Sequence, residues 1–131
     1  MSSDLPDDLD LKIVFAQLLA REPIFHRPLS GLTVADAEKL MVSDYWEIGA
    51  SGQRYDRALV LDEMSRREAQ PVDDAAWLVS QSECRRLSQD TFLFTYRLEQ
   101  GDRVTQRATI WIRSGDDWRI VYHQGTIVMA P

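Results

Sequence analysis

The chain has 131 residues, of which 44% are apolar and 27% charged, and its formal net charge is −6. That length fits one globular domain over residues 1–131, and no apolar run approaches the roughly 20 residues that a membrane-spanning helix needs. The negative charge and the scattered basic residues disfavour nucleic acid as a partner. We therefore expect a single domain that binds neither a membrane nor a nucleic acid.

The N-terminal ten residues are acidic and lack the basic segment and apolar run of a secretion signal, which favours a cytoplasmic location. The only cysteine, Cys84, cannot form an internal disulfide. No second thiol or histidine cluster offers the spacing of zinc ligands. We expect no metal ion and no other cofactor.

Three helices are predicted in the first half of the chain. Apolar residues recur at helical spacing over residues 11–18, and Pro23 ends this helix. A capping box that begins at Thr33 predicts a short second helix ending near Ser43. Asp56 can cap a third helix.

The second half of the chain is predicted to be sheet, after one short strand over residues 45–48. Turn residues separate four candidate strands, at 76–87, 91–99, 104–113 and 118–128. Strands that follow one another this closely pair antiparallel, and the helices precede them. The predicted fold class is α+β, with three N-terminal helices packed on one face of a strongly curved, mainly antiparallel sheet.

Two-residue hairpin loops at 101–102 and 115–116 fix which residues of the last three strands stand opposite one another. In this register Thr109 faces Tyr122, and Arg107 faces Gln124. The face that should meet the helices is aromatic, with three polar groups at one end: it contains Phe92, Phe94, Tyr96, Trp111, Trp118, Ile120 and Tyr122 together with Arg107, Thr109 and Gln124.

A face that mixes aromatic and polar side chains in this way is typical of a small-molecule pocket, here for a small hydrophobic or aromatic ligand. The expected pocket residues are Trp46, Tyr96, Thr109, Trp111, Tyr122 and Gln124. An aromatic stripe at strand spacing is also what a plain hydrophobic core contains, so both interpretations stay open. Apolar residues on the opposite face suggest a homodimer interface, formed by Ile110, Ile112, Val121 and His123.

Three segments, 45–52, 107–111 and 118–126, resemble a bacterial branch of the nuclear transport factor 2-like superfamily, and the ending WRIVYHQGT is the most specific of them. That superfamily includes ketosteroid isomerase, the SnoaL-like polyketide cyclases and dimeric association domains. The resemblance implies a sheet curled into a cone around a cavity, with helices closing it and frequent dimerisation. It does not fix a reaction, because members with this architecture differ in chemistry.

In ketosteroid isomerase a carboxylate base lies in the first strand after the helices, where this chain has Glu47. The resemblance thus implies Glu47 as a general base, and Arg107 could bind a substrate carboxylate or stabilise an enolate. The alternatives are that Glu47 points outward or pairs with an arginine, and that Arg107 forms an internal ion pair. Strand alternation puts His123 on the outer face, and His26 is expected in a loop or at a cavity mouth.

Two functions follow from these residues. The first is a small-molecule-binding domain that acts as an isomerase or lyase by removing a proton next to a carbonyl. The second is a non-catalytic homodimeric interaction module. Composition and patterning do not decide whether the protein is an enzyme.

Overall fold

The computed structural model describes residues 7–25, 33–68 and 77–129, so His26 lies outside the described part of the chain. Helix α1 (Asp7–Arg21) continues into the 3₁₀ turn η1 (Glu22–Phe25), and α2 (Val34–Leu40) and α3 (Arg57–Glu68) follow. The strands are β1 (Met41–Ile48), β2 (Arg54–Asp56), β3 (Leu78–Ser88), β4 (Thr91–Gln100), β5 (Arg103–Ser114) and β6 (Asp117–Ile127). The predicted α+β class is confirmed.

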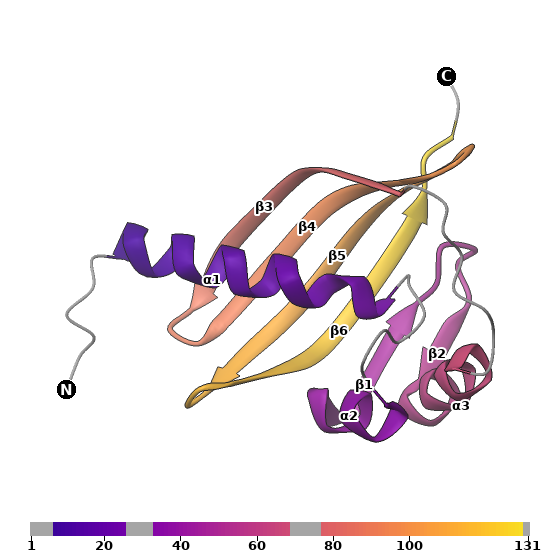
Figure 1. Cartoon of the computed structure of the whole chain (residues 1–131), viewed down its shortest axis with the longest axis horizontal. Helices are drawn as coiled ribbons and strands as arrows, with labels where there is room; N and C mark the ends of the chain where they lie inside the picture. Colours follow the sequence, from indigo (N-terminus) through magenta and orange to yellow (C-terminus); the bar gives the residue numbers. More distant parts are fainter. Residues whose placement is uncertain (1–6, 26–32, 69–76, 130–131) are drawn as a thin grey trace.

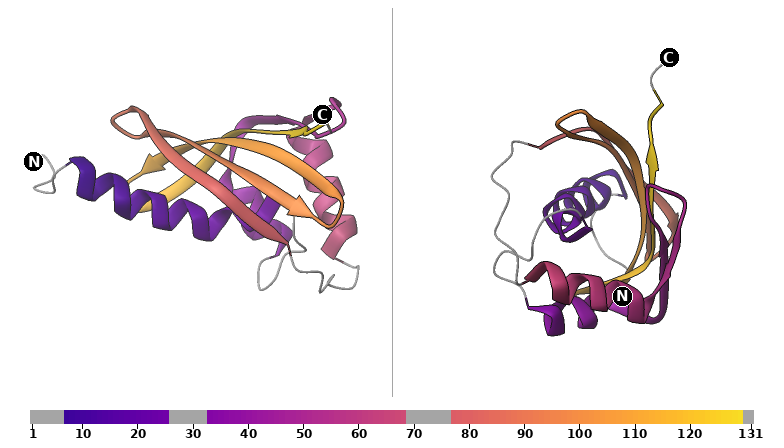
Figure 2. Two further views of the ribbon diagram at one scale, coloured as in Figure 1. Left: turned by 90° about the horizontal axis from the view of Figure 1, so that it is seen from above. Right: turned by 90° about the vertical axis from the view of Figure 1, so that its right-hand side faces the viewer.

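The six strands form one sheet in the order β2-β1-β6-β5-β4-β3, in which only the β1–β6 pair is parallel. The sheet curves around α1, which lies along its concave face, while α2 and α3 gather beside β1 and β2 at one end (Figures 1 and 2). The side chains of this concave face therefore lie between the sheet and α1.

The helix ends follow the local sequence. Pro23 cannot donate a backbone hydrogen bond, and the α-helix changes to a 3₁₀ turn beside it. At α2, Thr33 accepts from the Asp36 amide while the Asp36 carboxylate accepts from the Thr33 amide, which confirms the predicted capping box. Asp56 caps α3 through a 2.8 Å bond from the Leu59 amide.

The second helix is shorter and the first strand longer than predicted. Met41 already pairs with Ile120 in the sheet and is buried, so the apolar residue that was assigned to the helix belongs to β1. Strand β2, which pairs with the end of β1, was not predicted. Its three residues are too few for a periodicity to be visible.

Both hairpin loops are as predicted. Gly101 and Gly115 have positive φ angles of 64° and 62°, as tight two-residue turns require. Residues on β4 and β5 pair throughout in the expected register, with Trp111 opposite Phe92 and Thr109 opposite Phe94. The hairpin loops thus place the aromatic face correctly over these two strands.

Strand β6 leaves the predicted register halfway along. Trp111 pairs with Ile120 as expected, but Ile110 pairs with Tyr122, so Val121 is an additional residue that forms a β-bulge. Side chains alternate across a sheet, so one additional residue reverses which of the later side chains point inward. Thr109 therefore pairs with His123 and not with Tyr122, and Arg107 pairs with Gly125 and not with Gln124.

The hydrophobic core lies between α1, η1 and the concave face of the sheet. Trp118 bonds to Gln17 in the middle of α1, with 2.9 Å between the indole nitrogen and the amide oxygen. The fully buried aromatic residues of the core are Tyr45, Phe92, Phe94, Tyr96 and Trp111. Two of these residues also contact the polar groups near η1 and β1: Trp111 bonds to Glu22, and Tyr45 bonds to Glu47.

Candidate functional site

A carboxylate buried at the C-terminal end of the first helix is the centre of the polar groups on the concave face. Glu22, in η1, is only 2% exposed. It accepts a 2.7 Å bond from the Trp111 indole nitrogen and a 2.9 Å bond from the Thr109 hydroxyl. Burial raises the pKa of Glu22 to about 7, although bonds from Trp111, Thr109 and Tyr96 and the charge of Arg107 act in the opposite direction. This carboxyl group can change its protonation state near neutral pH.

A line of polar side chains runs across the sheet from Glu22. The Thr109 hydroxyl lies 2.7 Å from Nδ1 of His123, and Nε2 of His123 lies 3.4 Å from Nη1 of Arg107. The imidazole is 1% exposed and stacks on the Phe25 ring, with 3.8 Å between ring centres and 3° between ring planes. Glu22 at the helix end, Thr109 and Arg107 on β5, and His123 on β6 therefore form one connected chain of polar side chains.

Arg107 is half-buried on the concave face and bonds there to neutral groups. Its Nε donates a 3.0 Å bond to the Thr105 hydroxyl, and none of the ion pairs among the described residues includes it. Desolvation lowers the pKa of Arg107, against the opposing effects of Tyr96, Glu47 and Glu22. A desolvated guanidinium without a contact carboxylate is suited to binding an anionic group.

The guanidinium lies against Gly125 of β6, close to the end of β1. A Cβ atom placed on Gly125 would lie 3.5 Å from Cζ of Arg107 and 3.7 Å from Cβ of Ala50, which are ordinary van der Waals distances. The cation therefore lies near the segment that follows β1. This segment begins only two residues after Glu47.

Glu47 lies on the concave face, so the interpretation that it points outward is wrong. It pairs with His123 across the parallel β1–β6 ladder, and its carboxylate accepts a 2.7 Å bond from the buried Tyr45 hydroxyl. Desolvation raises the pKa of Glu47, while the Tyr45 bond and the charges of Arg67 and Arg107 lower it. The two carboxylates, Glu22 and Glu47, thus lie on either side of the His123 and Arg107 side chains.

Three of the six predicted pocket residues lie inward and three do not. Tyr96, Thr109 and Trp111 are buried on the concave face as predicted. Tyr122 and Gln124 follow the bulge and lie on the convex face, where their side chains bond to each other at 2.6 Å. Trp46 pairs with Tyr122 on that face and has Arg54 stacked on its ring, at 3.9 Å from the ring centre.

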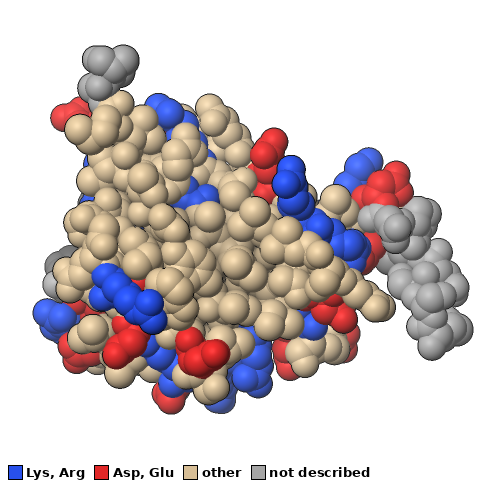
Figure 3. Space-filling view, turned by 180° about the vertical axis from the view of Figure 1, so that it is seen from behind, with Lys and Arg blue, Asp and Glu red and all other residues tan. Residues whose placement is uncertain are grey.

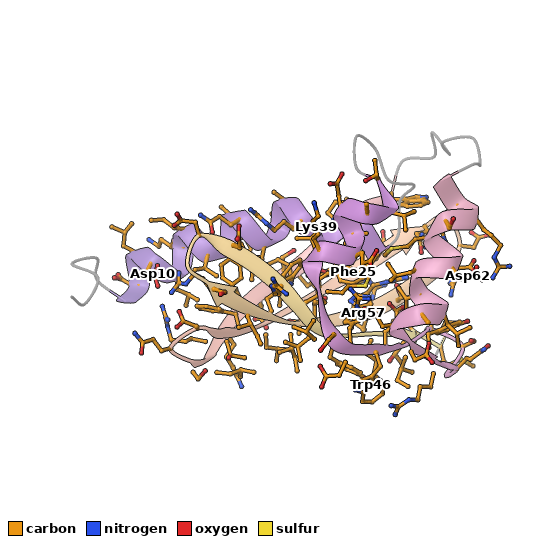
Figure 4. The ribbon with its side chains drawn as sticks, turned by 90° about the horizontal axis from the view of Figure 1, so that it is seen from below. Asp10, Phe25, Lys39, Trp46, Arg57 and Asp62 are labelled. Carbon is orange, nitrogen blue, oxygen red and sulfur yellow. The ribbon has the colours of Figure 1, made fainter. Side chains whose placement is uncertain are left out.

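Figure 4 shows Trp46 on the side of the sheet away from Phe25 and α1. Because of the same bulge, the predicted position of His123 on the outer face is wrong. His123 is one of the most buried polar residues of the concave face. The other three predicted interface residues, Ile110, Ile112 and Val121, are half-buried. Ile110 and Ile112 alternate with the inward-facing residues of β5 and so point to the convex face, and Val121 is the bulge residue.

Glu22 is the residue that the sequence analysis missed. A charged residue at the end of a helix is ordinarily solvated, and Pro23 indicates only where the helix ends. The signal was on the sheet: Trp111 and Thr109 were both predicted to face the helices, and a buried indole N–H needs an acceptor. Among the described residues no group of histidine, cysteine, aspartate and glutamate side chains could hold a metal ion.

Comparison with known proteins places the fold. No protein-family model matches the sequence, and no curated protein matches it. Solved structures do match. A nuclear transport factor 2-like family protein from Streptomyces avermitilis, described as a candidate dehydratase, superposes with a TM-score of 0.68 at 13% identity, over 95% of this chain and 100% of that one. The fold is nuclear transport factor 2-like.

Two further structures agree. A nuclear transport factor 2-like protein from Cytophaga hutchinsonii has a TM-score of 0.63 and 15% identity over 94% of this chain and all of that one. A protein of unknown function from Pectobacterium atrosepticum has a TM-score of 0.67 and 18% identity, with 95% and 94% of the two chains covered. Superpositions at identities this low establish only the cone-shaped architecture, which was predicted. The chemistry has to be argued from the residues of the site. No helix in the described ranges is long and apolar enough to cross a membrane.

Proposed function

We propose that the concave face beside η1 binds a small organic anion or carbonyl compound at Arg107, and that Glu47 removes a proton from the carbon next to the carbonyl. The observation that supports this most directly is the half-buried guanidinium, which has neutral hydrogen-bond partners and, within the described part of the chain, no carboxylate in contact with it. In a water-poor site such a cation stabilises the oxygen on which negative charge develops.

The proposed step is an enolisation. The Glu47 carboxylate forms an O–H bond as the C–H bond breaks, and the electron pair moves onto the carbonyl oxygen, which Arg107 stabilises. Returning the proton to another carbon makes the reaction an isomerisation, whereas departure of a neighbouring group makes it an elimination. The raised pKa of Glu47 makes its carboxylate a stronger base than an exposed one. The neighbour described as a candidate dehydratase is consistent with the second course.

Binding and proton transfer can be tested separately. Benzoate and cyclohexanone are titrated while amide shifts are followed by NMR, and deuterium uptake by cyclohexanone in D₂O measures proton abstraction. Arg107→Ala should weaken benzoate binding roughly 10- to 100-fold, as loss of a charged hydrogen bond predicts. Glu47→Gln should keep benzoate binding and lose deuterium uptake.

Arg119→Ala is the matched control, because Arg119 is an exposed arginine on the same strand, β6, as the glycine beneath Arg107. It should leave both measurements unchanged. Absence of binding at millimolar benzoate and cyclohexanone, or equal affinities in Arg107→Ala and wild type, would remove the proposal.

A second candidate function is association of two copies through the convex face of the sheet. Figure 3 shows that the middle of this face carries few charged residues, which gather toward its rim. Ile110 and Ile112 lie there among half-buried residues. Such a face is more apolar than a sheet surface exposed to water usually is, which favours an interface between two copies.

Sedimentation equilibrium decides this second candidate. Wild type should sediment as a dimer at micromolar concentration, and Ile110→Asp should sediment as a monomer with an unchanged circular dichroism spectrum. Leu59→Asp, an exposed leucine on α3, is the control and should remain dimeric. A monomeric wild type at all concentrations would rule the interface out.

A further inference from the structure

The hydrogen-bond chain from Arg107 to Glu22 permits only one arrangement of its protons when Glu22 is ionised. Arginine has donors only, so Nε2 of His123 must accept from Nη1 of Arg107. The Thr109 hydroxyl has one hydrogen and donates it to Glu22, so it must accept from Nδ1 of His123. His123 is therefore neutral, with its proton on Nδ1 and its lone pair on Nε2.

The opposite arrangement forms once Glu22 is protonated and Arg107 has released Nε2, because a protonated Nε2 and Nη1 of Arg107 are both donors. When the ligand gives a proton to Nε2, the ligand's bond to that hydrogen breaks and an N–H bond forms, while the Nδ1 proton passes to Thr109 and the Thr109 proton passes to the Glu22 carboxylate. Three bonds form and three break: the ligand loses one proton, Glu22 gains one, and the imidazole changes from its Nδ1–H form to its Nε2–H form. Separations of 2.7 and 2.9 Å along the inner part of the chain are within normal hydrogen-bond length.

We infer that Glu22, Thr109 and His123 form a proton relay that serves the proposed site, with Nε2 of His123 as its reactive atom. The inference rests on the proposed function. Phe25 stacks on the imidazole and fixes its plane, so Nε2 stays directed toward Arg107. The 3.4 Å separation between Nε2 and Nη1 of Arg107 is long for a hydrogen bond.

The position of His123 relative to Glu47 indicates what the relay would add. The two residues are paired neighbours on adjacent parallel strands and face the same side of the sheet. One group can then take a proton from a carbon while the other exchanges a proton with a second atom of the same ligand. This arrangement fits carbonyl compounds that lose a proton at one position and gain one at another.

Other charged groups also influence the imidazole. Arg107 on β5 disfavours a positively charged His123, and Glu47 on β1 and Glu22 on η1 favour it; the hydroxyls of Tyr45 and Tyr96 also lie on the concave face. Glu22 and Thr109 are accordingly positioning residues that act through His123. A test of the relay must therefore read the protonation of each imidazole nitrogen and not stability alone.

Nitrogen NMR of protein labelled with ¹⁵N-histidine provides that measurement without any ligand. A His26→Gln background leaves His123 as the single imidazole of the chain. At pH 8 the spectrum should show a protonated Nδ1 and an unprotonated Nε2. An imidazolium, or a proton on Nε2, would overturn the relay.

The decisive variant is Glu22→Gln, which should move the His123 proton from Nδ1 to Nε2 and thereby open the 3.4 Å contact between Nε2 and Nη1 of Arg107. Trp111 can only donate, so the single oxygen of the new amide faces Trp111 and its NH₂ group faces Thr109. The Thr109 hydroxyl then accepts from the amide, and its own hydrogen, no longer taken by a carboxylate, becomes available to donate to Nδ1. An unchanged proton on Nδ1 in this variant would refute the relay.

Two other variants serve as controls. Thr109→Ser keeps a hydroxyl and should keep the wild-type pattern. Asp10→Asn removes a carboxylate at the opposite end of α1 and should also leave the imidazole unchanged, which separates a relay effect from loss of stability. If either control moved the proton as Glu22→Gln does, the relay would be wrong.

A functional measurement distinguishes failure of the relay from failure of the proposed function. In wild type, cyclohexanone should take up deuterium, and Glu22→Gln should lower that rate tenfold or more while benzoate affinity stays within about threefold. Wild type without binding or exchange would contradict the proposed function, whereas wild-type exchange with an unaffected Glu22→Gln rate would contradict the relay.

Discussion

Each end of the first helix carries a carboxylate that contacts the sheet, and the surroundings of the two carboxylates shift their pKa values in opposite directions. Asp10, near the N-terminal end, contacts Arg86 at 2.6 Å and Arg113 at 3.2 Å. Hydrogen bonds from Arg113 and Arg86 hold its pKa below the ordinary value. Glu22, at the C-terminal end, has neutral donors only and a pKa raised to about 7.

The difference shows which end is structural. Pairing with two arginines lowers the energy of a charge at the protein surface and fixes α1 against β3 and β5. Burial among neutral donors leaves a charge that is costly to maintain, and such groups concentrate at functional sites. The contrast therefore supports an anchoring role for Asp10 and agrees with the proposed functional role of the Glu22 end.

The largest expected effect is on the pH dependence of stability. The folded-state pKa of Glu22 is about 7 and its ordinary value is 4.5, so the folded protein binds the proton more tightly and loses stability as pH rises between these values. The loss should be about 3 kcal/mol at most. Urea denaturation at pH 5 and pH 8 should show this fall in wild type and a much smaller one in Glu22→Gln.

A residual slope is expected in that variant, since burial also raises the pKa of Glu47. Glu47→Gln should remove part of it. Equal slopes in wild type and Glu22→Gln would mean that Glu22 is not the buried titrating group.

Asp10→Asn tests the other end and should have the opposite pH dependence. A lowered folded-state pKa contributes stability that is present above the ordinary pKa of 3.8 and is lost as pH falls through the folded-state value. The variant should be about 1 kcal/mol less stable than wild type at pH 7, because the ion pairs are only partly buried. In acid-denaturation curves the two proteins should converge as pH falls below the folded-state pKa of Asp10; a constant difference would argue against the ion pairs.

The smallest effect is expected in the middle of the helix. Gln17 bonds to Trp118 with uncharged groups, so Gln17→Ala should cost roughly 1 kcal/mol or less at every pH. Denaturation at pH 4, 6 and 8 should give the same difference each time. A pH-dependent difference would show that the two ends do not account for the titration.

Prediction from the sequence succeeded where local chemistry decides structure. Glycine at positive φ fixed both hairpins, and strand alternation then placed Tyr96, Thr109 and Trp111 inward. The capping residues fixed the starts of α2 and α3. Most of the sheet and three of the six predicted pocket residues were therefore accessible from the sequence.

The remaining part of the site depends on tertiary structure. No residue in the sequence marks the bulge at Val121, so Tyr122, Gln124 and His123 were assigned to the wrong faces. The parallel pairing of β1 with β6, which brings Glu47 beside His123, joins segments more than 70 positions apart. Burial of Glu22 likewise depends on how α1 ends over β5.

The bulge at Val121 also suggests how this architecture can acquire new chemistry. If Val121 instead paired with Ile110 and the bulge were lost, the downstream half of β6 would turn over: an imidazole and a glycine would leave the interior, and a phenol and an amide would enter it. The hairpin and the hydrophobic core before it would stay as they are. A shift of one residue in register could therefore exchange the functional groups offered to a ligand while the scaffold is preserved.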